Sequence, residues 1–262
     1  MMKQLKYINN QDILDQLKKY PNQGILFEII ETGVTGTILE LSKDVLIVRE
    51  NCNDPFVFVA GELTATNVLQ ITELLKDYKF PMVHCDKRFH PLFLEKGWNF
   101  HVRTLLKFNG TIDSHHKALS ISKVNSTEIF KQCTWYNERK ELYGSDDNFV
   151  NNGTGYALFV NDTLVSEAYA SIGANIAEIG VITADRYRGK GYATQVVSFM
   201  ISELAKRNIC PEWSCNIDNT ASLKTGLKLG FEIADYYTLL VPNCGNVLCP
   251  NLVKWLENKW RS

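Results

Sequence analysis

The sequence predicts an α+β fold in which helices flank a sheet and the chain is divided into two similar halves. Downstream of Gly155, short β-like runs alternate with helical ones in the order hairpin, strand, loop, helix, strand, helix, strand. A similar order can be traced between residues 36 and 108. The chain has 262 residues, of which 45% are hydrophobic, so it can bury the core that such a fold requires.

The elements of the second half follow from turn residues and apolar periodicity. The polar turn Asn161-Asp162-Thr163 predicts a hairpin. After Gly191, apolar residues recur at spacings of three and four, which predicts a helix with one apolar stripe. A second helix begins after Asn219, runs through Lys228 and ends at Gly230. The strands expected here are 156–160, 164–172, 176–183, 212–216 and 231–241.

The first half repeats this order in a degenerate form. Cys85 followed by Leu94-Glu95-Lys96-Gly97-Trp98 matches Cys215 followed by Leu227-Lys228-Leu229-Gly230-Phe231. We interpret this as an internal duplication, although any two layers of sheet and helix would show some of the same likeness. The polar stretch 110–117 is the expected linker, which gives a degenerate half at 1–115 and a second domain at 116–262. The expected strands are 36–41, 44–49, 56–60, 82–86 and 98–108, with helices ending at Pro81 and near 91–96.

The stretch from Thr183 to Ala193 lies between a predicted strand and the apolar-striped helix. A helix begins with backbone N–H groups that lack internal partners, and its dipole adds positive charge, so this position suits a phosphate. Gly189 and Gly191 allow close approach of the backbone, and three cations lie in the same turn: Arg186, Arg188 and Lys190. The alternatives are a ligand-free basic turn, a dinucleotide loop, which needs three glycines, and a P-loop, which needs Gly-Lys-Ser or Gly-Lys-Thr.

These residues resemble the pyrophosphate loop of the GNAT superfamily of N-acetyltransferases, in which Arg186, Gly189 and Gly191 fill the family positions. Asn219-Thr220-Ala221-Ser222 and Lys228-Leu229-Gly230-Phe231 resemble a second family motif. The stretch Pro211-Glu212-Trp213-Ser214-Cys215 and the hairpin entry Gly153-Thr154-Gly155-Tyr156 resemble the branch that contains zwittermicin A resistance acetyltransferases. The superfamily resemblance covers about residues 121–241 and implies a mixed, mostly antiparallel central sheet flanked by helices.

The resemblance also implies that acetyl-CoA is the cosubstrate and that it lies along the strand that ends at Thr183. Its pantetheine would bond to the backbone of Val181, Ile182 and Thr183, and its pyrophosphate would bind the loop. The loop positions implied are Arg186, Arg188, Gly189, Lys190, Gly191, Tyr192 and Ala193. Asn219 and Ser222 would lie beside the cofactor arm, but Asn219 also suits a simple helix cap.

An amine that attacks a thioester must be neutral, so the site should supply a base. Glu178 is the candidate catalytic residue, because it lies on the strand that would hold the thioester; the alternative is that it pairs with a cation on a neighbouring strand. The family's tyrosine acid corresponds to Gly226, so that role cannot be transferred. Tyr236, Tyr237 and Cys215 are candidate substitutes.

Composition narrows the classes of partner. With 28 basic and 29 acidic residues, the chain carries no charge excess for nucleic acid. The seven cysteines are spaced unlike zinc ligands, so no metal is expected, and reduced thiols are favoured. Neither a signal peptide nor an apolar membrane-spanning run is evident, which predicts a cytoplasmic protein.

The sequence therefore predicts an acetyl-CoA-dependent N-acetyltransferase. Its acceptor would be a primary amine of a small molecule, such as an aminopolyol antibiotic, a polyamine or an amino acid, or of a peptide. A non-catalytic CoA-binding sensor is the alternative, because Gly226 replaces the expected acid. A nucleotide-binding domain is a third interpretation, and the sequence indicates no oligomeric state.

Overall fold

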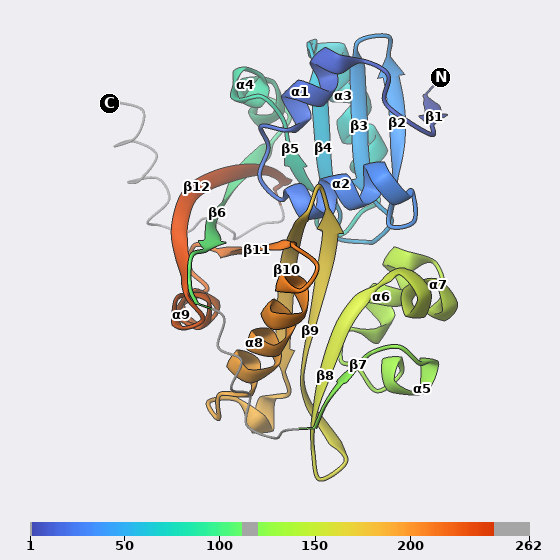
Figure 1. Ribbon diagram of the computed structural model, residues 1–262. Coiled ribbons are helices and arrows are strands. Elements are labelled where there is room, and N and C mark those ends of the chain that lie inside the picture. Colours follow the sequence, from blue (N-terminus) through green and yellow to red (C-terminus); the bar gives the residue numbers. More distant parts are fainter. Residues whose placement is uncertain (1, 112–119, 244–262) are drawn as a thin grey trace.

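A computed structural model describes residues 2–111 and 120–243 (Figure 1). The described strands form one 12-stranded sheet in the order β1-β2-β3-β4-β5-β12-β6-β11-β10-β9-β8-β7. The elements of the first half are β1 (Lys3–Leu5), α1 (Gln11–Leu17), α2 (Gln23–Thr32), β2 (Gly36–Ser42), β3 (Val45–Glu50), β4 (Phe56–Gly61), α3 (Ala65–Leu75), β5 (Met82–His84), η1 (Lys87–Phe89), α4 (His90–Leu94) and β6 (Trp98–Phe108).

The second half repeats this arrangement of strands. In each half the first three strand pairs are antiparallel and the fourth, β4 with β5 or β10 with β11, is parallel. Its elements are β7 (Ser120–Lys123), α5 (Thr127–Phe130), α6 (Tyr136–Tyr143), α7 (Asp146–Asn152), β8 (Thr154–Val160), β9 (Thr163–Gly173), β10 (Ile176–Thr183), η2 (Asp185–Tyr187), α8 (Tyr192–Ala205), β11 (Cys210–Asn216), α9 (Thr220–Lys228) and β12 (Phe231–Pro242).

The last strand of each half pairs with the other half. β6 lies between β11 and β12, and β12 lies between β5 and β6, so each half's terminal strand crosses over to complete the sheet (Figure 1). The predicted α+β fold with two tandem halves is confirmed. The predicted division at residue 115 lies outside the described residues, and the assignment of two separate domains stays a prediction.

Helices cover both faces of the sheet in each half. In the first half, α1 and α2 bury Leu17, Leu26 and Ile29 on one face, and α3 and α4 bury Ile71 and Phe93 on the other. In the second half, α8 packs with α9 on one face, and α5, α6 and α7 pack on the opposite face. One of these four apolar clusters, the one beneath α8 and α9, includes residues of both β10 and β11 and packs the strands where they meet.

Helix α2 also ties the two halves together, because two glycines let it approach β9 and β10 closely. A Cβ on Gly24 would lie 2.7 Å from the backbone nitrogen of Glu178, and a Cβ on Gly173 would lie 2.1 Å from the backbone nitrogen of Glu28. Real side chains do not tolerate such distances, so only glycine fits at both positions. The start of α2 is therefore fixed against the strand that carries Glu178.

Candidate active site

The strands β10 and β11 separate in their second halves. Their parallel pairing runs from Ile176 opposite Cys210 to Ile179 opposite Trp213 and then stops. β10 continues to Thr183 beside β9, and β11 continues to Asn216 beside β6. The facing edges beyond Ile179 have no strand partner on that side, so backbone groups of β10 are available to an extended ligand.

A cavity of about 730 Å³ opens at this separation. Its walls come from both halves: β10 and β11, the helix α6, and the segment around the β3–β4 connection of the first half. Four of the predicted site residues line it, namely Glu178, Val181, Asn219 and Ser222. Ile182 and Thr183 do not line the cavity. The Ile182 carbonyl accepts a hydrogen bond from the Ser166 hydroxyl at 3.0 Å, and the Thr183 hydroxyl lies 2.8 Å from the same hydroxyl.

The glycine-containing loop has the geometry that the sequence predicts for an anion site. Gly189 and Gly191 both have positive φ, 76° and 80°, in the region that disfavours side chains with a β-carbon. Gly191 occupies the N-cap of α8, where no side chain caps the helix. The first intrahelical bond runs from the Gln195 N–H to the Gly191 carbonyl, so the N–H groups before Gln195 have no partner within the helix.

The loop's cations lie around one aromatic ring. The Arg186 guanidinium and the Lys190 ammonium are 4.9 and 5.3 Å from the ring centre of Tyr187. Arg188 pairs with Asp185 at 2.9 Å, but both side chains are exposed and the ion pair contributes little to stability. These residues lie at the end of β10 rather than on the cavity wall, as expected for the diphosphate end of a long ligand.

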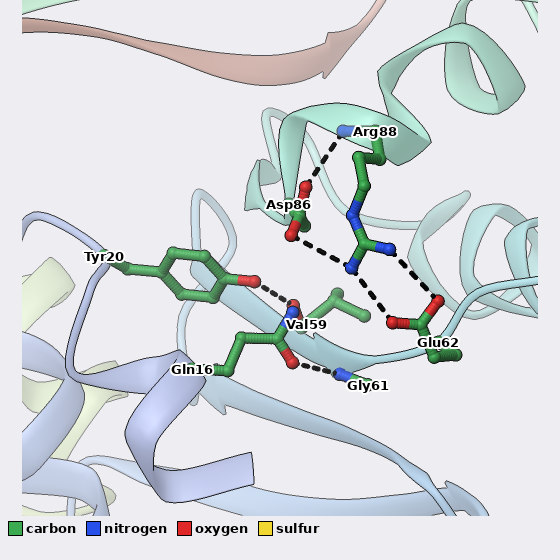
Figure 2. Close-up of polar contacts among 7 residues, drawn as sticks. All are labelled: Gln16, Tyr20, Val59, Gly61, Glu62, Asp86 and Arg88. Carbon is green, nitrogen blue, oxygen red and sulfur yellow. Dashed lines mark hydrogen bonds and ion pairs between the residues drawn. The ribbon is translucent and has the colours of Figure 1, made fainter. Parts of the chain in front are cut away.

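The corresponding turn of the first half, which follows β4, makes internal polar contacts instead (Figure 2). There α3 is capped by a box in which the Thr64 side chain bonds the Asn67 N–H and the Asn67 side chain returns the bond. The turn carries Glu62, which pairs with Arg88 at 2.9 Å, and the Gly61 N–H is bonded to Gln16 at 2.7 Å (Figure 2). The N-terminus of α3 is capped by side chains of its own segment, and we expect no phosphate seat at this turn.

Glu178 lines the cavity and is only 8% exposed. Its Oε1 accepts hydrogen bonds from the Ser214 hydroxyl at 2.6 Å and from the Asn22 amide at 2.8 Å. Its Oε2 has no partner among the described residues. Burial raises the pKa of Glu178, and hydrogen bonds from Ser214 and Asn22 oppose part of that rise.

Asn22 is the centre of the network behind Glu178. Its amide donates to Glu178 and to Ser214, and its carbonyl oxygen accepts from the Tyr237 hydroxyl at 2.9 Å and from His84 at 3.1 Å. All four hydrogen bonds of this amide are made, and the residue is fully buried. Burial lowers the pKa of His84 to about 3, so its ring is neutral and its Nε2 donates to Asn22.

Arg103 closes the network on the β6 side. Its guanidinium donates to Tyr237, Asn216 and Ser214 at 3.0, 2.7 and 3.1 Å. Sequence reasoning names Glu178 and Tyr237 but misses Asn22, Ser214, His84 and Arg103. The alternative that Glu178 only pairs with a neighbouring cation does not describe this geometry, because its direct partners are neutral side chains.

Asn219 and Ser222 each combine a structural bond with a place on the cavity wall. The Asn219 side chain accepts from the Ser222 N–H at 3.0 Å, which is the helix cap that the sequence suggests. The Ser222 hydroxyl accepts from the Trp213 indole at 3.0 Å. Of the candidate acids, Cys215 lines the cavity, Tyr237 is buried within the network and Tyr236 is absent from the wall.

Two further results concern other classes of site. Among residues 2–111 and 120–243, no three His, Cys, Asp or Glu side chains are grouped as metal ligands would be. Over the same residues, no helix has the length and apolarity needed to cross a bilayer. His115, His116, Cys244 and Cys249 lie outside the described residues.

Fold and site together define a two-half α+β protein with one opened strand pair and one uncapped helix N-terminus. A family model described as GNAT acetyltransferase matches residues 16–240. The chain therefore belongs to the GNAT acetyltransferase family.

Individual relatives agree with this assignment. The uncharacterized N-acetyltransferase YdfB of Bacillus subtilis (strain 168) is 31% identical over 126 residues, 47% of this chain and 48% of YdfB, so the chain matches about half of that relative's length. A GCN5-related N-acetyltransferase-like protein from Streptococcus suis 89/1591 superposes with a TM-score of 0.68 at 21% identity, covering 87% of this chain and 96% of its own. A tandem GNAT protein from the clavulanic acid biosynthesis pathway gives 0.56 at 9% identity, covering 92% and 97%.

The similarity to these two solved structures shows the fold alone, because both are distant in sequence. The second of them is itself a tandem GNAT protein. The narrower resemblance to the zwittermicin A resistance branch stays a prediction.

Proposed function

We propose that this protein transfers an acetyl group from acetyl-CoA to a primary amine of a small molecule or peptide. The observation that carries the proposal is the alignment of three features along one line of the fold. Along β10 and the loop that follows it, Glu178 comes first and lines the cavity, the unpaired edge of β10 comes next, and the uncapped N-terminus of α8 comes last. This order suits a thioester, an extended arm and a diphosphate in turn.

Each part of the ligand has a candidate partner. The backbone of residues 189–193, with Arg186, Arg188 and Lys190, would hold the diphosphate, and the edge from Val181 to Thr183 would bond the pantetheine. Asn219 and Ser222 would contact the arm from α9. Acetyl-CoA supplies an activated acetyl group, and its thiol, with a pKa of about 8.5, leaves without strong acid assistance.

Glu178 would act as the general base. The amine nitrogen forms a bond to the acetyl carbon, the carbon–sulfur bond breaks, and the proton lost by the amine passes to Glu178. The thiol of CoA is released and takes up a proton from solvent. Burial raises the pKa of Glu178 above that of an ordinary glutamate, which brings it closer to the pH at which a base is efficient.

Valine at Gly189 and Gly191 tests the proposed cofactor seat. Both positions have positive φ, so a β-branched side chain would distort the loop and cover its N–H groups. We expect CoA affinity to fall by at least about 10- to 100-fold, as measured by calorimetry. Gly97→Val is the matched control, because Gly97 has φ of 79°, lies away from the loop and has no atom within 4 Å of the position that a Cβ would take.

If the doubly substituted protein is folded and binds CoA as tightly as the unmodified chain, the proposal is wrong. The alternative, a non-catalytic CoA-binding sensor, is favoured by Gly226, which places no acid on α9. Thiol release with a panel of amines separates the two functions, because a sensor binds CoA without turnover of any acceptor. Comparable affinity for ATP would instead support a nucleotide-binding domain.

A further inference from the structure

Two buried carboxylates at or behind the cavity wall, Glu28 and Glu50, have no role in the proposed chemistry, and they accompany Glu178, the proposed base. Glu28, Glu50 and Glu178 are each less than 9% exposed, and Glu50 and Glu178 line the cavity. Glu50 is the last residue of β3 in the first half, whereas Glu178 belongs to β10 in the second half. The group is therefore assembled only where the two halves meet.

Neutral donors hold these carboxylates. Glu50 accepts from the Phe56 N–H at 2.8 Å, and Glu28 accepts from the Tyr143 hydroxyl at 3.1 Å. Within the described residues, none of the three has a lysine, arginine or histidine nitrogen within 4 Å. A buried carboxylate without a cation is costly, and the charges of Glu28 and Glu178 add to the rise in the pKa of Glu50.

Three cations line the cavity, Lys79, Arg103 and Arg139, and none of them forms an ion pair with Glu28, Glu50 or Glu178 among the described residues. Burial raises the pKa of Glu28 and that of Glu50, the latter to about 7, and the charge of Arg139 on α6 opposes only part of either rise. The Arg139 guanidinium lies over the rings of Trp135 and Tyr169, 5.4 Å from each ring centre. The rim adds further acids, Asp54, Glu138 and Glu141, none of which forms an ion pair among the described residues.

A positively charged group on the substrate would supply the counterion that these carboxylates lack when it binds in the cavity. The reacting amine meets Glu178, whose Oε2 is buried and has no partner among the described residues. An acceptor with a single amine gives up its charge to Glu178 and leaves Glu50 without a counterion. An acceptor with a second, unreacting ammonium supplies that counterion in a charge-assisted hydrogen bond.

We infer that the acceptor carries at least two amines, as a diamine or polyamine does, and that Glu50 binds the ammonium that does not react. The inference rests on the proposed acetyl transfer and narrows its substrate class. Glu50 is then a specificity-determining residue, contributed by the half that has no phosphate seat. This gives the first half a role in acceptor choice.

The experiment compares cadaverine with hexylamine, which has the same number of non-hydrogen atoms and one amine fewer. With acetyl-CoA saturating and the pH at about 8, we expect kcat/KM for cadaverine to exceed that for hexylamine by about 10- to 100-fold. In Glu50→Gln, which retains an acceptor for the Phe56 N–H, that ratio should fall to about one. Glu95→Gln, an exposed acid away from the cavity, should keep the ratio of the unmodified chain.

A binding readout keeps the test decisive when turnover is slow. Cadaverine, added to the protein saturated with CoA, should raise the melting temperature of the unmodified chain and not that of Glu50→Gln, while hexylamine should raise neither. Unchanged affinity for CoA confirms that the variant is folded.

Equal use of hexylamine and cadaverine overturns the inference and leaves the proposed function intact. Preference for aminocaproate, a zwitterion of similar length, also overturns it, since Arg139 would then be selecting a carboxylate. CoA binding without acetylation of any amine contradicts the proposed function instead, and the melting shift then decides whether Glu50 binds a diamine.

Discussion

Asn22 has an unusual position for a residue at the start of a helix. It caps α2 by location, but its side chain makes no capping bond and instead bonds Glu178, Ser214, His84 and Tyr237. Its φ of 62° is one that asparagine tolerates better than most residues. Because both donors of its amide point toward Glu178 and Ser214, the carboxylate is held with Oε1 occupied and Oε2 free. Asn22 is thus a positioning residue for the proposed base.

The pH dependence of kcat/KM tests this pair. As the proposed base, Glu178 acts in its carboxylate form, so we expect activity to be lost as the pH falls through its raised pKa. Glu178→Gln should lower kcat by about 10²- to 10⁴-fold. It should also abolish the loss of activity at low pH, which is the acidic limb of the pH profile. Asn22→Gly keeps the positive φ but removes a donor that lowers the pKa of Glu178, so the limb should move to higher pH.

Initial rates over a pH series with saturating acetyl-CoA provide the measurement. A role in folding alone would reduce the rate of Asn22→Gly equally at every pH. An acidic limb that persists unchanged in Glu178→Gln would show that another group takes the proton.

At the level of elements, the sequence predicts β2 to β6, β8 to β12 and the helices α3, α4, α8 and α9, and it misses β1, β7 and the helices α1, α5 and α7. β10, β6 and α9 have the expected limits, because alternation, flanking turns and a capping asparagine are local signals. Helix α2 is missed. It is buried on nearly all sides between its own sheet and β9, so Gly24 to Ile30 shows no polar face.

Helix α6 is missed for the opposite reason. It is short and mostly charged, and only Leu142 and Tyr143 are buried. No apolar stripe marks it in the sequence, although it forms one wall of the cavity. Such a helix is fixed by tertiary packing rather than by its own pattern.

The candidate site also divides into a part that local sequence patterns predict and a part that depends on tertiary packing. The glycine loop is contiguous, so its geometry follows from local residues. The network around Glu178 joins residues that are 156 and 215 positions apart in the chain, as Asn22 contacts Glu178 and Tyr237. No local pattern encodes these pairs, because they depend on the contact between α2 and β10.

Two glycine substitutions test how tightly that contact is packed. Alanine at Gly173 would place its Cβ 2.1 Å from the backbone of α2, so α2 must shift, and we expect a loss of about 1–3 kcal/mol in unfolding free energy. Gly226 lies within α9, and a Cβ there would meet only the side chains of Leu106 and Trp213, at 3.5 Å or more. We therefore expect alanine at this position to raise the unfolding free energy by about 0.5–1 kcal/mol.

Urea denaturation of both variants measures the difference. Gly173→Ala should also reduce acetylation, since its shift displaces Asn22. Equal stability of the two variants would mean that the close approach of α2 contributes nothing to the junction of the halves.

For the whole molecule, the exchange of terminal strands makes the two halves mutually dependent. β6 completes the second half's sheet beside β11 and delivers Arg103 to Ser214, while β12 completes the first half beside β5. Removing one half therefore removes a strand from the middle of the other half's sheet. Removing the first half also removes Asn22, which bonds Glu178, and Glu50 on the cavity wall, although the proposed phosphate loop itself is untouched.

Separate expression of residues 1–111 and 120–262 tests this dependence. Without β6, the second fragment exposes the edge of β11 and the apolar side chains that Leu106 covers, a combination that favours aggregation or strand exchange between copies. We expect neither fragment to give a folded monomer by circular dichroism and gel filtration, and we expect the mixed fragments to recover CoA binding. A monomeric, cooperatively folding 120–262 fragment that binds CoA like the intact chain would show instead that β6 is dispensable. The first half would then serve acceptor choice only, because the fold of the second half would not require it.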